Sequence, residues 1–338
     1  TSSMMAVALQ ACGADPSFAI GGTITASGSN AHRGTGEIFV AEADESDGSF
    51  IEYHPFAAIV TNVEHDHVDF FATPEDVAQA FKDFAATINN DGFLTYCADD
   101  EGARALASTV KTCTLISYGI DESCDLRLDS IELEAMGSRA RAIWRGKVVG
   151  FIELQVPGHH NLLNAAAVLA TGLNLGFPAP ELLTGLSVFR GTGRRFELIG
   201  TVHGVRVIDD YGHHPTEIDV TLKAARRFAG DGRLIVIFQP HRYSRTKAFS
   251  AQFAKALDVA DRAIVLEVYA ASEKPIAGVT SRLITDAMSH GEYIPNFIEV
   301  TDSVIDSAEP QDVIITLGAG DVSSLAPIIV DGLTRRFG

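Results

Sequence analysis

Two stretches rich in carboxylates and histidines have the composition of a divalent-cation site. Residues 41–47 read AEADESD and include Glu42, while residues 61–69 read TNVEHDHVD and include His67. Magnesium in proteins is usually held by one or two carboxylates, and water and phosphate oxygens complete its coordination shell. The first stretch therefore predicts a magnesium site or a solvent-exposed acidic turn, and the second predicts a contact to a metal or a phosphate.

The second stretch also allows a different class of metal site. His65, His67 and Asp69 have the spacing HxHxD, which resembles the HxHxDH signature of metallo-β-lactamase-like zinc hydrolases. The sixth position is Phe70, however, and no obvious matching set of zinc ligands follows downstream. A zinc hydrolase therefore remains an alternative interpretation, which tightly bound, stoichiometric zinc would support.

The sequence GHHNLLN at residues 158–164 places two histidines and an asparagine at the expected start of a helix. Exposed amide groups and side-chain donors at a helix N-terminus suit an anion or a nucleobase. Asn161 could equally serve as the residue that caps this helix. The stretch predicts either a nucleotide contact or a local helix cap.

Arginines and histidines concentrate in three later stretches. They read GRRF at residues 193–196, DDYGHHPTE at residues 209–217 and QPHRYSRTK at residues 239–247. A guanidinium group can bind phosphate or carboxylate through two parallel hydrogen bonds. The chain has a formal net charge of -18, so this local positive charge favours an anion site over an ordinary solvated loop.

These stretches lie beside segments that we expect to be buried strands. Short apolar runs bounded by turns predict strands at residues 37–41, 57–61, 91–97, 205–209, 234–238, 262–268 and 312–316. Helices are expected at residues 3–12, 74–88, 162–174, 180–186, 215–228, 248–257 and 280–289, and residues 111–156 are expected to be rich in β-structure. Alternating strands and helices predict an α/β fold with parallel sheets, in which ligands bind at the carboxyl ends of the strands.

Length and composition predict two domains in a globular protein. The 338 residues exceed the usual size of one domain, and 46% of them are hydrophobic. The Gly- and Arg-rich segment at residues 189–196 interrupts the hydrophobic pattern, so we expect domains at residues 1–188 and 189–338.

Charge and hydropathy exclude several classes of function. The net charge of -18 argues against a nucleic-acid partner, because phosphate backbones need clustered Lys and Arg. No apolar run reaches the roughly 18–20 residues of a membrane span, and no basic signal sequence opens the chain. The four cysteines show no CxxC spacing. A cytoplasmic protein without a membrane partner is expected, and its oligomeric state is left open.

The ordered set of motifs resembles the Mur ligase family over the whole chain. Its members are AEADESD, TNVEHDHVD, PGHHNLLNA, GRRFE, DDYGHHPTE, FQPHRYSRT, EVYAASEKP and GAGDV. The resemblance implies a central P-loop-type ATPase domain with a mostly parallel sheet, followed by a C-terminal Rossmann-like α/β domain. It also implies that a nucleotide-sugar-binding domain and the phosphate loop GTHGKT lie upstream, so that these 338 residues alone would be inactive.

The resemblance further implies an activity and a set of site residues. The reaction is the ATP-dependent ligation of L-alanine to UDP-N-acetylmuramate through an acyl phosphate, with Mg²⁺, in peptidoglycan precursor synthesis. The implied metal ligands are Glu42 and His67, and the implied ATP contacts are His160, Asn161, Asn164, Arg195 and Asp210. Around the amino acid and acyl phosphate it implies Tyr211, His213, His241, Arg242 and Arg245, of which His213, Arg242 and Arg245 are catalytic. As a hypothesis, His213 removes a proton from the alanine ammonium group.

One alternative lies within the same family. A murein-tripeptide recycling ligase attaches a peptide to the same nucleotide sugar, and its members lack the string HRYSRT. Residues 241–246 carry this string intact, which favours L-alanine.

Overall fold

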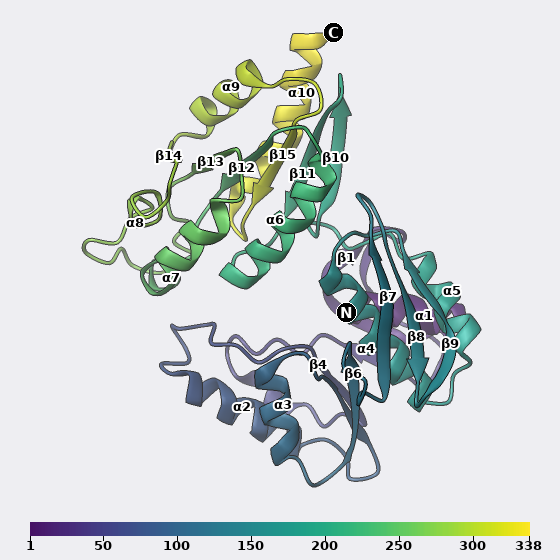
Figure 1. Cartoon of the computed structure of the whole chain (residues 1–338). Coiled ribbons are helices and arrows are strands. Elements are labelled where there is room, and N and C mark those ends of the chain that lie inside the picture. Colours follow the sequence, from purple (N-terminus) through teal and green to yellow (C-terminus); the bar gives the residue numbers. More distant parts are fainter. The chain divides into compact units, whose positions relative to one another are not determined.

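The computed structural model describes residues 1–338, and the chain forms two compact units, Thr1–Thr192 and Gly193–Gly338 (Figure 1). Each unit has a hydrophobic core of its own. The division at residues 192/193 falls inside the Gly- and Arg-rich segment, slightly after the position expected from the sequence. The two units are described separately below.

The first unit is built on a six-stranded sheet with the order β4-β5-β6-β7-β8-β9. Neighbouring strands from β4 to β7 are parallel, whereas β7, β8 and β9 form an antiparallel meander. The strands are β4 (Ala57–Val60), β5 (Phe93–Cys97), β6 (Thr114–Gly119), β7 (Leu126–Leu133), β8 (Ser138–Trp144) and β9 (Lys147–Leu154). The last four account for the β-rich segment predicted at residues 111–156.

A second, three-stranded sheet in this unit has the order β2-β1-β3. It consists of β1 (Ser17–Ile24), β2 (Ser29–His32) and β3 (Phe39–Ala41). The sequence predicted only β3. Strand β1 was missed because two adjacent glycines interrupt its alternation, and glycine is depleted in strands.

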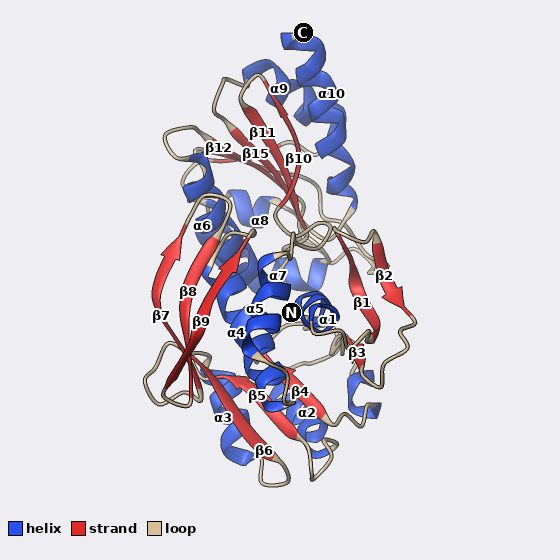
Figure 2. Cartoon of the chain, turned by 90° about the vertical axis from the view of Figure 1, so that its right-hand side faces the viewer, coloured by secondary structure: helices blue, strands red, loops and turns tan.

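Helices α1, α4 and α5 fill the space between the meander and the small sheet (Figure 2). Helix α4 is rich in alanine and leucine and is buried along most of its length, so it forms the centre of the core. Helix α2 begins with a capping box in which Thr73 and Asp76 bond each other's backbone amides. The helices are α1 (Ser2–Ala11), α2 (Pro74–Ala86), α3 (Glu101–Thr109), α4 (His159–Asn174) and α5 (Ala179–Ser187), with a short 3₁₀ helix, η1 (Ser49–Glu52).

The second unit is a doubly wound α/β domain with the strand order β10-β11-β15-β12-β13-β14. All neighbours are parallel except β10 and β11. The strands are β10 (Glu197–Val202), β11 (Val205–Asp210), β12 (Leu234–Phe238), β13 (Arg262–Val265), β14 (Gly291–Tyr293) and β15 (Val313–Leu317). The predicted α/β fold with parallel strands is confirmed.

Alternate residues of these strands pack on opposite faces of the sheet. Val236 lies in the core formed with α6 and α7, whereas its neighbour Ile237 lies in the core formed with α9 and α10. Burial on both faces explains why β12 and β15 read as continuous apolar runs. The helices are α6 (Pro215–Ala229), α7 (Tyr243–Leu257), α8 (Arg282–Thr285), α9 (Phe297–Ser307) and α10 (Leu325–Phe337), with a short 3₁₀ helix, η2 (Asp321–Ser324).

Several predicted boundaries were wrong. Helix α7 begins at Tyr243 instead of residue 248, because the polar segment before its apolar face continues the helix. The helix predicted at residues 280–289 shrinks to the four residues of α8, and β13 ends at Val265 instead of residue 268. None of the helices combines the length and the apolar character needed to cross a bilayer.

Candidate active site

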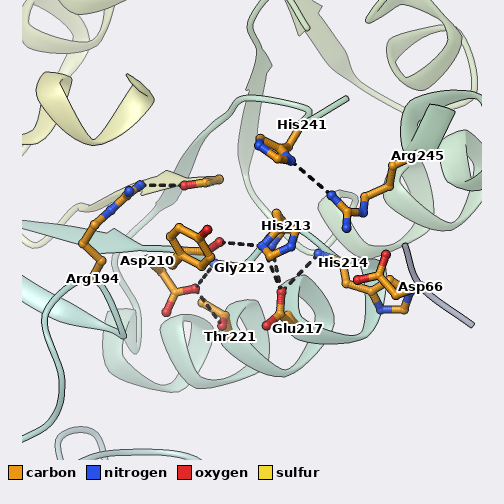
Figure 3. A network of polar contacts seen from close by, with 12 residues as sticks. Asp66, Arg194, Asp210, Gly212, His213, His214, Glu217, Thr221, His241 and Arg245 are labelled. Carbon is orange, nitrogen blue, oxygen red and sulfur yellow. Dashed lines mark hydrogen bonds and ion pairs between the residues drawn. The ribbon is translucent and has the colours of Figure 1, made fainter. Parts of the chain in front are cut away.

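Three loops meet at the carboxyl edge of the second unit's sheet (Figure 3). They follow β11, β12 and β15, which are parallel neighbours in the sheet. In-register parallel strands bring their carboxyl ends to one edge, so residues far apart in the sequence become neighbours there. The edge gathers the predicted site residues Arg195, Asp210, Tyr211, His213, His241, Arg242 and Arg245.

Arg194, which the sequence analysis assigned no role, fixes this edge. Its Nε donates to Asp209 Oδ2 at 3.1 Å, and its Nη2 donates to the Gly318 carbonyl at 2.7 Å. Asp209 is buried and also accepts a hydrogen bond from Thr316 Oγ1 at 2.6 Å. Arg194 therefore ties the boundary segment to β11 and to the loop after β15.

Asp210, the predicted ribose contact, is enclosed by groups of its own unit. Its side chain accepts hydrogen bonds from the amides of Phe196 and Gly212, both at 2.8 Å, and from Thr221 Oγ1 at 3.3 Å. Burial raises the pKa of Asp210 to about 6, although the Arg195 charge and the two amides lower it in part. The protein's own donors thus satisfy this carboxylate in the structure, and ribose binding stays a prediction.

Glu217 is a central acid that the sequence analysis did not single out. It occupies the first turn of α6, where its carboxylate accepts hydrogen bonds from the backbone amides of His213 and His214. Its Oε1 also accepts a hydrogen bond from Arg195 Nη1 at 3.1 Å. Burial raises the pKa of Glu217, but the charges of His213 and Arg195 outweigh this effect and lower it to about 2. The capping-box spacing from His214 to Glu217 was the signal in the sequence.

Aromatic and imidazole rings line the same edge. His213 packs edge-on against Tyr211 and His241, with ring centroids 5.1 Å and 5.6 Å apart. His241 stacks on Tyr269, and its Nδ1 lies 3.1 Å from Nη1 of the buried Arg245. The structure therefore joins the predicted amino-acid residues Tyr211, His213, His241 and Arg245 in one cluster.

Arg242 holds a strained backbone conformation at the start of α7. Its backbone dihedral angles are φ 69° and ψ 140°, a combination that residues other than glycine rarely adopt. Its amide donates to the Tyr269 carbonyl at 2.8 Å, and its carbonyl accepts a hydrogen bond from Thr246 Oγ1 at 2.8 Å. Contacts on both sides keep Arg242 in this conformation, as is typical of residues at functional sites.

The loop after β13 is fastened to the loop after β12. His241 and Tyr269 form a parallel β-bridge, and the Tyr269 amide donates to the Pro240 carbonyl at 2.8 Å. Glu273 accepts a hydrogen bond from the Ser244 amide at 3.0 Å, in the first turn of α7. Residues 266–273 thereby position the helix that carries Arg245.

In the first unit, His67 lies beside Glu45. Its Nε2 is 3.2 Å from Glu45 Oε1, and its φ of 51° marks a left-handed backbone conformation. Glu42, the other predicted metal ligand, faces Gly21 so closely that a Cβ there would lie 2.7 Å from Glu42 Oε1. The space that Gly21 leaves open holds this carboxylate at the end of β3.

The zinc-type spacing does not assemble a zinc site. His65 Nε2 lies 3.1 Å from the Phe71 carbonyl oxygen. Among residues 1–338 no group of three or more His, Cys, Asp or Glu side chains is placed to hold a metal ion.

The predicted nucleotide contacts of the first unit, His160, Asn161 and Asn164, all lie in the first two turns of α4. The expectation that Asn161 caps this helix is wrong, because Gly158 occupies the N-cap position, and Asn161 Nδ2 instead donates to the Pro157 carbonyl at 2.7 Å. Asn164 Oδ1 accepts a hydrogen bond from Thr1 Oγ1 at 2.9 Å. The nucleotide role of these three residues stays a prediction.

Comparisons with known proteins agree with this arrangement. Residues 23–172 match the family model "Mur ligase middle domain", and residues 194–320 match "Mur ligase, glutamate ligase domain". Among solved structures, UDP-N-acetylmuramate–alanine ligase MurC from Thermotoga maritima superposes with a TM-score of 0.82 at 27% identity, covering 99% of this chain and 73% of that one. A murein peptide ligase from Psychrobacter arcticus shares the fold, with a TM-score of 0.73 at 22% identity, covering 98% of this chain and 74% of that one.

Curated relatives are more similar in sequence. UDP-N-acetylmuramate–L-alanine ligase of Paenarthrobacter aurescens (strain TC1) is 50% identical over 98% of this chain and 72% of its own length. The enzyme of the same name from Acidothermus cellulolyticus is 47% identical over 100% of this chain and 72% of its own length. With this identity, this coverage and the two family domains in order, the chain belongs to the Mur ligase family.

Proposed function

We propose that the protein ligates L-alanine to UDP-N-acetylmuramate at the expense of ATP, in the cytoplasm, as a step of peptidoglycan precursor synthesis. The observation that carries this proposal is the cluster of His213, His241 and Arg245 beside Arg195 at one sheet edge. Such a cluster suits a reaction in which a phosphoryl group and an amino-acid carboxylate must be held together. The names of the curated relatives support the choice of substrates.

The first step forms an acyl phosphate. A carboxylate oxygen of UDP-N-acetylmuramate attacks the γ-phosphorus of ATP, the bond to the β-phosphate oxygen breaks, and ADP leaves. Both reactants are anions, so cationic groups must neutralise them as they approach. We assign Arg195 to the phosphate, and His160, Asn161, Asn164 and Asp210 to the rest of the nucleotide.

The second step forms the amide bond. The free amine of L-alanine attacks the acyl carbonyl, and the tetrahedral intermediate collapses with loss of inorganic phosphate. The ammonium group of L-alanine must first lose a proton to become this amine, and we assign the removal of that proton to His213, because an imidazole accepts protons near neutral pH. Arg242 and Arg245 are proposed to hold the alanine carboxylate, and Tyr211 and His241 complete the amino-acid site.

We propose that Glu42 and His67 hold Mg²⁺, and that water and phosphate oxygens would complete its coordination shell. The observation that favours this is the open space at Gly21, which lets the Glu42 carboxylate lie against β1. When bound, Mg²⁺ would neutralise phosphate charge. Glu42 would provide a hard oxygen donor, and His67 a ring nitrogen.

The test measures ADP formation by the full-length protein with ATP, Mg²⁺ and UDP-N-acetylmuramate. ADP and a product heavier by one alanine residue are expected with L-alanine, and much less with glycine, L-serine or the murein tripeptide. ADP formation that requires the tripeptide would support the recycling ligase instead. No amino-acid-dependent ADP from any of the four acceptors would refute the proposal.

A further inference from the structure

We infer that Glu217 is a positioning residue. It determines which ring nitrogen of His213 is able to accept a proton, and it holds the Arg195 side chain in position. The inference rests on the proposed function and deepens it. Glu217 is not among the residues proposed to contact ATP, UDP-N-acetylmuramate or L-alanine.

The Glu217 carboxylate joins two segments of the site. Oε1 accepts a hydrogen bond from Arg195 Nη1 at 3.1 Å. Oε2 accepts hydrogen bonds from the His213 amide at 3.0 Å and the His214 amide at 3.2 Å, and lies 3.5 Å from His213 Nδ1. One side chain thus links the boundary segment with the loop after β11. Figure 3 shows the contacts of Glu217 with His213 and His214.

The surroundings of the His213 ring determine which of its nitrogens carries the proton. Nδ1 lies 3.2 Å from the Tyr211 carbonyl oxygen and 3.5 Å from Glu217 Oε2. Both of these atoms are acceptors, so Nδ1 must be the donor in the neutral ring. Nε2 then carries the lone pair, and it is the atom that can accept a proton from the alanine ammonium group. Catalytic histidines are commonly oriented in this way by a carboxylate on the opposite nitrogen.

The charged groups around His213 favour this arrangement. Glu217 Oε2 faces the ring, Arg195 bonds the other oxygen of the same carboxylate, and His241 packs edge-on against the ring. Glu217 remains ionised across the neutral range because its pKa is lowered to about 2. A fixed negative charge beside Nδ1 makes the imidazole a stronger base.

A simpler explanation is that Glu217 only caps helix α6. The capping box of α2 provides the comparison. Asp76 Oδ2 accepts a hydrogen bond from the Thr73 amide at 2.9 Å, and Thr73 Oγ1 accepts one from the Asp76 amide. The Asp76 carboxylate bonds within its own capping box, whereas the Glu217 carboxylate also contacts Arg195 and His213. The two roles can be separated by glutamine, which keeps the cap but loses the charge.

The test compares Glu217→Gln with Asp76→Asn in the full-length protein. We expect Glu217→Gln to fold like the wild type, to lose about tenfold or more in kcat for alanine-dependent ADP formation and to raise KM for ATP. The acidic limb of its kcat/KM profile should move to lower pH by about half a unit or more. Asp76→Asn should change none of these kinetic values.

A second measurement does not depend on ligase activity. In nitrogen-15 NMR spectra of the 338-residue chain, the wild-type His213 ring should show the Nδ1–H tautomer, and its titration midpoint should fall in Glu217→Gln. If Glu217→Gln keeps the kcat, KM and pH profile of the wild type, the inference is wrong. If the wild-type protein forms no alanine-dependent ADP, the proposed function fails, and an unchanged His213 titration in the variant would then overturn the link to Glu217 separately.

Discussion

His241 Nδ1 and Arg245 Nη1, four residues apart in the sequence, lie within hydrogen-bond distance at 3.1 Å. A guanidinium group can only donate, so His241 Nδ1 must be the acceptor and its ring must be neutral with the proton on Nε2. Protonation of His241 would place two positive charges side by side. The hydrogen bond between Arg245 and His241 therefore requires a neutral His241.

Arg245→Lys should weaken the use of L-alanine while preserving the fold. Lysine keeps the charge but loses the planar fork that can bind a carboxylate and His241 at the same time. We expect KM for L-alanine to rise by about tenfold or more, with a smaller effect on KM for ATP. Lys247→Arg on the exposed face of α7 is the control. Equal KM values for L-alanine in Arg245→Lys and the wild type would contradict the assignment.

Replacing Arg242 by glycine should give a more stable variant than replacing it by alanine. Both changes remove the guanidinium group, so both should abolish ligation. Only glycine adopts φ 69° without strain, so Arg242→Gly should exceed Arg242→Ala by about 1–2 kcal/mol in free energy of unfolding. Urea denaturation of the two variants measures the difference. The strain argument fails if Arg242→Ala proves equally stable.

The neighbouring arginines Arg194 and Arg195 should differ in what their loss changes. Arg194→Ala strands the buried carboxylate of Asp209, so we expect a loss of about 2 kcal/mol in stability after allowing for the partial exposure of Arg194. The Arg195 side chain is 51% exposed, so Arg195→Ala should lose well under about 1 kcal/mol and act mainly on KM for ATP. Thermal unfolding and steady-state kinetics distinguish the two. A reversed order of stabilities would overturn this division of roles.

The free energy of unfolding of Asp210→Asn should increase relative to that of the wild type as the pH rises. The pKa of Asp210 is raised from 3.8 to about 6, so the fold favours the protonated acid. That contribution to stability is complete below about pH 4 and is lost as the pH rises through 6. Asparagine has no such loss, so the variant should gain on the wild type between pH 4 and pH 7, by up to about 3 kcal/mol.

Urea unfolding at pH 4.5 and pH 7.5 measures this gap, with the exposed Asp219→Asn on the same helix as a control. A gap between Asp210→Asn and the wild type that stays constant or narrows with rising pH would show that Asp210 is not a buried acid with a raised pKa.

Much of the fold could be predicted because burial leaves a direct signal in the sequence. The strand at residues 234–238 was predicted at its observed limits, since five consecutive apolar residues bounded by polar ones suit a strand buried on both faces. Helix α7 was placed too late because its first turn is polar and resembles a loop. Strands β10 and β14 lie at the sheet edges, and their burial is too incomplete to leave a clear pattern.

The site was predicted only as far as residue type carries information. Runs of His, Arg and Asp identified the loops at the carboxyl edge, and the parallel order of β11, β15 and β12 brings them together. The sequence could not show that Glu217 links Arg195 to His213, because that link depends on how the α6 cap faces the boundary segment. Nor could it show the strain at Arg242, which depends on the bridge to Tyr269.

Residues 266–273 are bound to the loop after β12, which limits how either stretch can be exchanged between relatives. A chimera that imports residues 239–247 from a relative would separate the Tyr269 bridge and the Glu273 contact from the partners they fit. Exchange of both segments together transfers a self-contained module. We propose that these loops set amino-acid selectivity, so changes in selectivity should arise as paired substitutions in residues 239–247 and 266–273, and exchange of one stretch alone should impair the protein.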